Sequence, residues 1–163
     1  MSLDTRTKRM LCFPQYRTDT AICIHNEGWD VMYFYRVEHG TNSHIGPYNL
    51  NDLPREVIRD TTIYELPWWH GNETHPGMWR DCKRLDIHHS SCDYYCGFHS
   101  FESFCAWFEI DLLDMLHRNG FILAVYDIDS CYVSRGTYQS IMIKMYAVRV
   151  DTMVLTDVQQ LYA

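Results

Sequence analysis

The sequence predicts an α+β fold, in which a mainly antiparallel sheet packs against one long amphipathic helix and a long aromatic-rich loop. Three observations predict this class. Short runs of β-branched and aromatic residues recur along the chain, one stretch carries apolar residues at helical spacing, and residues 60–97 show little periodicity of either kind. The 163 residues contain no internal repeat and no Gly/Ser-rich linker, so we expect a single domain over residues 1–163.

The first elements are short. Ala21–Ile24 is a candidate strand, and Val31–Glu38 is rich in the aromatic and β-branched residues typical of a buried strand. Turn residues follow at His39–Ser43 and end it. Asn51 or Asp52 can then cap a short helix that continues through residues 55–59.

The long helix is the clearest element. Ser100 is a good N-cap, and Asn119-Gly120 supplies a C-terminal stop. Between them, one face carries apolar residues at helical spacing, and the opposite face carries carboxylates. The apolar residues are Phe101, Phe104, Cys105, Phe108, Leu112, Met115 and Leu116.

The last part of the chain predicts strands. Phe121–Ile128 is nearly apolar throughout and is expected to be a central strand. Cys131–Val133 is a second candidate, and residues 138–150 alternate well enough for one long or bulged strand. Met153–Leu155 can add a final short pairing.

The loop at residues 60–97 is the first candidate for function, because a loop of this length is uncommon in a compact domain unless it has a role. It contains Trp68, Trp69, His70 and Trp79, which are residue types that anchor interfaces and stack on rings. The alternative is that they form a small core that folds the loop back on the sheet.

Charge narrows the choice of partner. Fourteen basic and twenty-one acidic residues give a net charge of −7, which argues against a nucleic-acid partner. Residues 101–129 hold six acidic residues and one base, Arg118. This acidic stretch is either a solvated helix face or a docking surface for a basic partner protein.

The sequence also favours a protein of the cytosol. No stretch approaches the roughly 20 apolar residues of a membrane span. The apolar run Met10–Phe13 is cut short by Pro14 and is too brief for a signal peptide. Seven cysteines, an odd number, favour reduced thiols over a disulfide framework. We therefore expect no membrane association.

Zinc is one candidate ligand, because six cysteines and histidines fall within residues 82–99. The best tetrahedral set is Cys82, His89, Cys92 and Cys96, in which only Cys92 and Cys96 have the usual spacing of a zinc-binding pair. The alternative is that these are buried thiols and hydrogen-bonded histidines, with no cofactor bound.

Thiol catalysis is a second candidate. Cys96 lies just before the predicted helix, whose N-terminus would lower the pKa of its thiol, and a histidine of the loop could act as the base. The alternative is a core cysteine. The phosphate-binding loop, the dinucleotide-binding glycine motif and the common hydrolase motifs are absent from the sequence, so no enzyme class is assigned.

A series of short sequence motifs, here called words, extends over about residues 33–141. In order, the words are Tyr35-Arg36-Val37-Glu38, Gly46-Pro47-Tyr48, His75-Pro76, Asp81, Cys96-Gly97-Phe98-His99-Ser100, Trp107-Phe108, Leu116-His117, Gly120-Phe121 and Ala124-Val125-Tyr126, followed by Gly136 and Gln139. This pattern resembles small accessory proteins encoded by bacteriophages and prophages. The resemblance implies a role in the host cell cytosol through a host protein, often one that serves defence, and implies no reaction.

The same layout is faintly similar to that of ADP-ribosyltransferases. The similarity implies that Arg36 and Ser100 hold NAD, with His75 near the pocket. It fails at Gln139, where the family has a carboxylate, because a neutral amide cannot supply the anion that the chemistry requires. Three hypotheses follow. The first is a protein that binds and modulates a host protein. The second is a protein that binds NAD or ADP-ribose, or an enzyme similar to ADP-ribosyltransferases, and the third is an interaction domain stabilised by zinc.

Overall fold

The computed structural model describes residues 30–50, 53, 55–66, 73, 75–83 and 93–160. Several predicted features lie outside the described residues. These are the strand at Ala21–Ile24, the capping residues Asn51 and Asp52, the loop residues Trp68, Trp69 and His70, and two of the candidate zinc ligands, His89 and Cys92.

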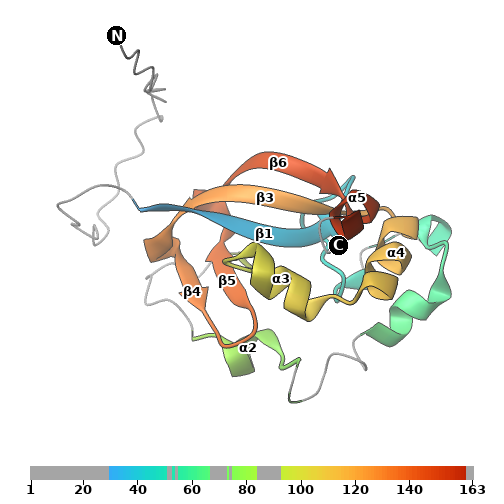
Figure 1. Cartoon of the computed structure of the whole chain (residues 1–163), viewed down its shortest axis with the longest axis horizontal. Helices are drawn as coiled ribbons and strands as arrows, with labels where there is room; N and C mark the ends of the chain where they lie inside the picture. Colours follow the sequence, from blue (N-terminus) through green and yellow to red (C-terminus); the bar gives the residue numbers. More distant parts are fainter. Residues whose placement is uncertain are drawn as a thin grey trace, which may run out of the picture.

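Two three-stranded antiparallel sheets form the frame, which confirms the α+β class (Figure 1). The first sheet has the order β1-β3-β6 and consists of β1 (Val31–His39), β3 (Phe121–Asp129) and β6 (Val148–Val154). The second has the order β2-β5-β4 and consists of β2 (Tyr94–Gly97), β5 (Ser140–Ile143) and β4 (Val133–Arg135).

The two sheets meet where β1 passes the end of β2. Tyr35 and Phe98 exchange two backbone hydrogen bonds of 2.8 Å there. Gly97 makes this approach feasible, because a Cβ atom at this position would lie 2.3 Å from a ring carbon of Phe34 and 2.4 Å from the carbonyl oxygen of Tyr35. A larger residue at position 97 would push the sheets apart.

Alternation along β1 and β3 sends side chains to two separate cores. On one face of the first sheet, Val37 and Leu123 pack with the helices. On the other face, Phe34 and Tyr126 pack with Tyr95 and the second sheet. The first sheet is therefore the middle layer, and Figure 1 shows α3 in front of it and the β4–β5 hairpin below.

In place of the one predicted long helix, the structure has two, α3 (Phe101–Trp107) and α4 (Ile110–Arg118). Phe108 and Glu109 between them have extended backbone. Phe108, at the break, is buried in the same cluster as Leu112 and Leu116. The predicted ends are correct: Ser100 caps α3 by accepting a hydrogen bond from the Ser103 N–H, and Asn119 caps the C-terminus of α4, before Gly120 at a φ of 79°.

The remaining helices are short. They are α2 (Met78–Asp81), α5 (Leu155–Gln159) and the 3₁₀ turns η2 (Arg55–Val57), η3 (Thr61–Glu65), η4 (Ser130–Tyr132) and η5 (Lys144–Tyr146). The predicted loop at residues 60–97 thus contains η3, α2 and β2. In the described part of the chain, no helix has the length and hydropathy needed to cross a bilayer.

Two strand predictions need correction. The single strand predicted over residues 138–150 is divided by η5, where the chain leaves the second sheet at β5 and enters the first at β6. The strand predicted at Cys131–Val133 begins only at Val133, because the preceding residues form η4. Met153 belongs to β6, whereas Leu155 starts α5 and enters the core.

Candidate functional site

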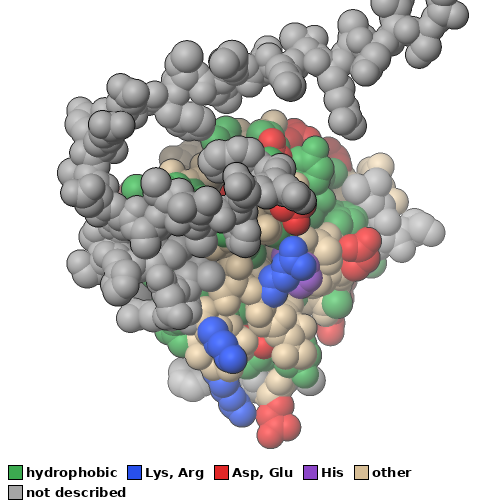
Figure 2. All heavy atoms as spheres, turned by 90° about the vertical axis from the view of Figure 1, so that its left-hand side faces the viewer, with side chains coloured by type: hydrophobic (Ala, Val, Ile, Leu, Met, Phe, Trp, Pro, Cys, Tyr) green, Lys and Arg blue, Asp and Glu red, His purple; other side chains and the backbone are tan. Residues whose placement is uncertain are grey.

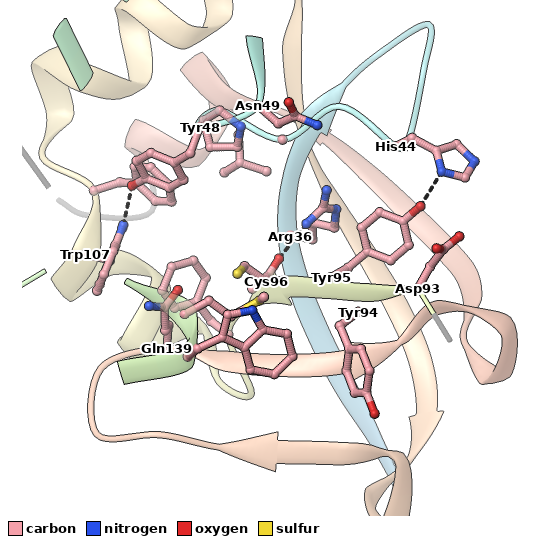
Figure 3. Close-up of a pocket in the computed structure, with 18 residues that line it drawn as sticks. Arg36, His44, Tyr48, Asn49, Asp93, Tyr94, Tyr95, Cys96, Trp107 and Gln139 are labelled. Atoms are coloured by element: carbon pink, nitrogen blue, oxygen red, sulfur yellow. Dashed lines mark hydrogen bonds between the residues drawn. The ribbon is translucent and has the colours of Figure 1, made fainter. Parts of the chain in front are cut away.

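A pocket of about 630 Å³ lies where the two sheets meet (Figure 3). Its lining comes from β1, β2, α2, the loop at residues 44–49 and the junction of α3 with α4. The side chains that define it are Arg36, His44, Tyr48, Asn49, Trp79, Asp93, Tyr94, Tyr95, Cys96, Trp107 and Gln139. A volume of this size is typical of sites for small organic ligands.

Arg36 is the charged centre of the pocket and is only 5% exposed. Its Nη1 donates a 2.7 Å hydrogen bond to the Cys96 carbonyl, and its guanidinium carbon lies 4.4 Å from the centre of the Tyr95 ring. Its Nε is buried without a hydrogen-bond partner among the described residues and lies 3.5 Å from Glu38 Oε2. Burial lowers the pKa of Arg36 from its usual value, although Glu38 opposes this.

Glu38 is fully buried behind Arg36 and is shared by several groups. It accepts a hydrogen bond of 2.7 Å from the Tyr126 hydroxyl and one of 3.1 Å from Arg149 Nη1. Lys144 Nζ donates to the same Tyr126 hydroxyl at 2.6 Å. One buried carboxylate therefore faces three cationic side chains, so the cations around it are only partly neutralised.

Two hydrogen-bonded aromatic pairs stand on opposite sides of Arg36, as Figure 3 shows. On one side, Trp107 Nε1 donates a 2.6 Å hydrogen bond to the Tyr48 hydroxyl. On the other side, the Tyr95 hydroxyl is hydrogen-bonded to His44 Nδ1. Because each ring is held at its polar end, the pocket presents aromatic walls in fixed positions.

The short helix α2 is tied to the hairpin loop between β4 and β5. The Asp81 carboxylate accepts hydrogen bonds of 2.8–2.9 Å from the backbone N–H groups of Thr137, Tyr138 and Gln139. Gln139 Nε2 also donates to the Pro76 carbonyl at 2.6 Å. These contacts hold Trp79, which lies on α2, against Tyr94 at a ring-centre distance of 5.4 Å.

The structure brings some of the predicted site residues together and separates others. Arg36 and Trp79 both line the pocket, and His75 packs edge-on against Trp107, with its Nε2 3.3 Å from the Trp107 carbonyl oxygen. Ser100 is not part of the lining, because its hydroxyl caps α3. The role that the ADP-ribosyltransferase similarity implies for Ser100 therefore has no support in the pocket geometry.

Of the four predicted zinc ligands, Cys82 and Cys96 are described. Cys82 Sγ lies 3.4 Å from the Gln139 carbonyl oxygen, and burial raises the pKa of its thiol to about 12. Burial likewise raises the pKa of the Cys96 thiol to about 11, so the predicted lowering by the helix N-terminus is wrong. No group of three or more potential metal ligands occurs within the residues that the structure describes.

A second surface lies at the end of the first sheet where β1 begins. Tyr33, Asp127 and Val148 form a row across the three strands, and directly opposed residues share a face. Val31 and Tyr33 are each 58% exposed, and Val148 is 51% exposed. Figure 2 shows hydrophobic, acidic and basic side chains mixed on the part of this side that is not drawn in grey. We call Val31, Tyr33, Asp127, Asp129 and Val148 the open sheet end.

Sequence reasoning missed the groups around Glu38. Tyr126, Lys144 and Arg149 come from β3, η5 and β6, and only the folded pairing brings them to one carboxylate. Glu38 itself gave a signal, because it is a carboxylate inside an otherwise apolar predicted strand. Tyr48 belongs to the Gly46-Pro47-Tyr48 motif, but the sequence does not show its contact with Trp107, because the two residues are 59 positions apart.

Comparison with known proteins gives one family. The family model described as "Bacteriophage T4 Y00F protein" matches residues 32–156, a range that includes both sheets apart from the first residue of β1. No curated protein and no solved structure matches the chain.

Proposed function

Because this chain belongs to the bacteriophage T4 Y00F protein family, we propose that it is a phage accessory protein that binds and modulates a protein of the infected host cell. That the chain is a small protein of a bacteriophage family follows from the family match over residues 32–156. The proposed binding to a host protein, for example one of a defence system in the cytosol, is supported by a surface on the first sheet.

The open sheet end is the observation that carries this proposal. An edge strand offers unpaired backbone groups to another chain, and natural proteins usually blunt such an edge with charge or a cover. In the described part of the chain, β6 is an outer strand, and Val148, Val150 and Val154 are 41–51% exposed. Val148 lies on the same face as Tyr33, and these two side chains form an apolar strip beside an edge strand that a partner strand can extend.

Charge indicates the chemistry of the partner. Asp127 and Asp129 lie on the same face of the first sheet as Tyr33 and Val148, and the chain carries a net charge of −7. An extended segment that alternates apolar and basic residues would satisfy both the apolar strip and the carboxylates. The proposed partner therefore offers a basic edge.

Two other contact surfaces remain predictions. Trp79 is 47% exposed, so it can contribute to an interface together with Trp68 and Trp69 of the predicted loop. On the predicted acidic helix face, Asp114 is paired with Arg118, which also reaches Asp60 at 2.7 Å. This pairing leaves fewer free carboxylates on α4 for a basic partner.

The experiment is capture of host proteins from lysate with a Tyr33→Arg/Val148→Arg variant. Both side chains are more than half exposed, so the circular dichroism spectrum should not change, whereas charge repulsion should reduce capture of a basic partner at least tenfold. Tyr64→Arg is the matched control, because Tyr64 is 46% exposed and lies on η3.

Capture by the wild type and the control, with loss in the double variant, supports the proposal. Equal capture by all three proteins excludes the open sheet end as the interface. The variant Trp68→Ala/Trp69→Ala/Trp79→Ala tests the loop in the same assay, where full capture would exclude the loop.

A further inference from the structure

The pocket around Arg36 has features of a ligand site that the proposed host interface does not use. Arg36 is 5% exposed; among the described residues, its Nη1 donates to the Cys96 carbonyl and its Nε lies 3.5 Å from Glu38 Oε2. A buried guanidinium ordinarily has its charge and its donors matched. The remaining N–H groups of Arg36 can donate to an acceptor in the pocket.

The direction of the free donors is set by the loop at residues 44–49. A Cβ atom at Gly46 would lie 3.1 Å from Arg36 Nη2, so the glycine lets this nitrogen reach the pocket wall. In Figure 3 the guanidinium lies between Tyr48 on one side and Tyr95 on the other. A group bound at this nitrogen would therefore lie inside the pocket.

The charge around Arg36 favours an anion. Glu38 is shared between Arg36 and Arg149, and Lys144 lies 5.9 Å from the Tyr95 ring, on which Arg36 also rests. Asp93 also lines the pocket but is exposed, and Figure 3 places it beyond Tyr95. An anionic group at Arg36 would face an excess of positive charge, with Asp93 at the rim.

The walls favour a flat ring attached to that anion. Tyr48 and Tyr95 are fixed through their hydroxyl groups, and Trp79 stands on α2 beside Tyr94. Aromatic side chains stack on heterocyclic bases, and the volume of about 630 Å³ accommodates a nucleotide. Asn49, also in the lining, carries a side-chain amide of the kind that recognises the polar edge of a base.

We propose that this pocket binds a nucleoside phosphate, with the phosphate on the Arg36 guanidinium and the base against the aromatic walls. An arginine fork matches phosphate oxygens in a bidentate manner. The NAD and ADP-ribose of the sequence-based alternative belong to the same ligand class. The proposal involves binding only, with no covalent step.

The test is isothermal titration calorimetry of the purified chain with adenosine, guanosine and uridine monophosphates and with ADP-ribose. The parent nucleosides and inorganic phosphate are the comparison ligands. We expect at least one nucleotide to bind tenfold or more tightly than its nucleoside and than phosphate alone. No binding of any nucleotide at millimolar concentration, or equal affinity for nucleotide and nucleoside, overturns the proposal.

Variants connect the affinity to the pocket. Arg36→Lys keeps the charge but removes the fork, and we expect at least a tenfold loss of nucleotide affinity. Since Arg36 also supports β2 through the Cys96 carbonyl, Trp79→Ala is the second variant, at a side chain that is 47% exposed and dispensable for the core. It should weaken binding at least fivefold.

Tyr64→Ala is the control, because Tyr64 is equally exposed at 46% and lies outside the pocket. Unchanged affinity in both Arg36→Lys and Trp79→Ala overturns the assignment. The titration contains no partner protein, so its failure leaves the host interface untouched, and failure of the capture experiment leaves the pocket untouched.

Discussion

At the scale of single residues, Gly97 is where the two sheets are closest. Gly97→Ala would place a methyl group 2.4 Å from the Tyr35 carbonyl oxygen, so backbone has to move. We expect the free energy of unfolding to fall by about 3 kcal/mol, at or above the usual range for overpacking. Urea denaturation measures it.

Gly77→Ala is the control for this substitution, because a Cβ atom at Gly77 meets no atom within 4 Å. A Gly97→Ala protein as stable as Gly77→Ala would show that the sheets separate at little cost.

The buried thiols give a second prediction at this scale. Burial raises the pKa of the Cys82 thiol to about 12 and of the Cys96 thiol to about 11, and only the thiolate reacts with an alkylating reagent. In iodoacetamide at pH 8.5 the folded protein should keep both thiols unmodified for hours. In urea, all seven cysteines should be labelled.

Peptide mass spectrometry measures the labelling at each site. Rapid modification of Cys96 in the folded state would contradict the raised pKa and would revive thiol catalysis at this position.

At the scale of elements, Asp81 joins α2 to the β4–β5 loop. Asp81→Ala removes the acceptor of three backbone N–H groups, so we expect a loss of about 1–3 kcal/mol and faster amide exchange at residues 137–139. Hydrogen exchange followed by mass spectrometry measures both the location and the size of the change.

Asp111→Ala is the matched control, because Asp111 is exposed in the first turn of α4. It should leave residues 137–139 protected. Equal exchange at these residues in wild type and Asp81→Ala would show that the loop does not depend on the carboxylate.

The division of the predicted long helix shows what local sequence can and cannot specify. Both ends were predictable, because Ser100 and Gly120 act locally. The break at Phe108 was not, because the apolar spacing continues across it and gives no local signal for an end. In the same way, the alternation from residue 138 to 150 fits either sheet, so the change of sheet at η5 has no local signal.

At the scale of the whole molecule, pH should change stability in the mildly acidic range. Burial lowers the pKa values of His39 and His99 below the usual 6.5. The unfolded chain then binds more protons than the folded one below about pH 6.5, so the free energy of unfolding falls as the pH drops from 7 to 5. Thermal unfolding at several pH values measures it.

His39→Gln should flatten this dependence, because burial of His39 disfavours its protonated ring in the folded protein. His117→Gln, at a half-buried position in α4, is the control. A steeper fall in the His39 variant than in wild type would contradict this explanation.

The candidate site could be predicted only in part, for a reason that also belongs to the whole molecule. Arg36 and Trp79 were predictable as polar and aromatic residues in unusual places. That they meet in one pocket was not predictable, because the pocket forms only after β1 meets β2, where the Arg36 hydrogen bond to Cys96 spans 60 residues. Residue types can be recognised one at a time, whereas a pocket depends on long-range pairing.

The pairing of β1 with β3 has a consequence for synthesis on the ribosome. His39 pairs with Phe121, so about 80 residues have to be added before the partner of β1 exists, which takes about 4–16 s at 5–20 residues per second. During that interval the nascent chain carries Phe34 and Val37 without their core. Chaperones therefore have several seconds to bind β1 before the first sheet can close, and β6 is the last strand to join it.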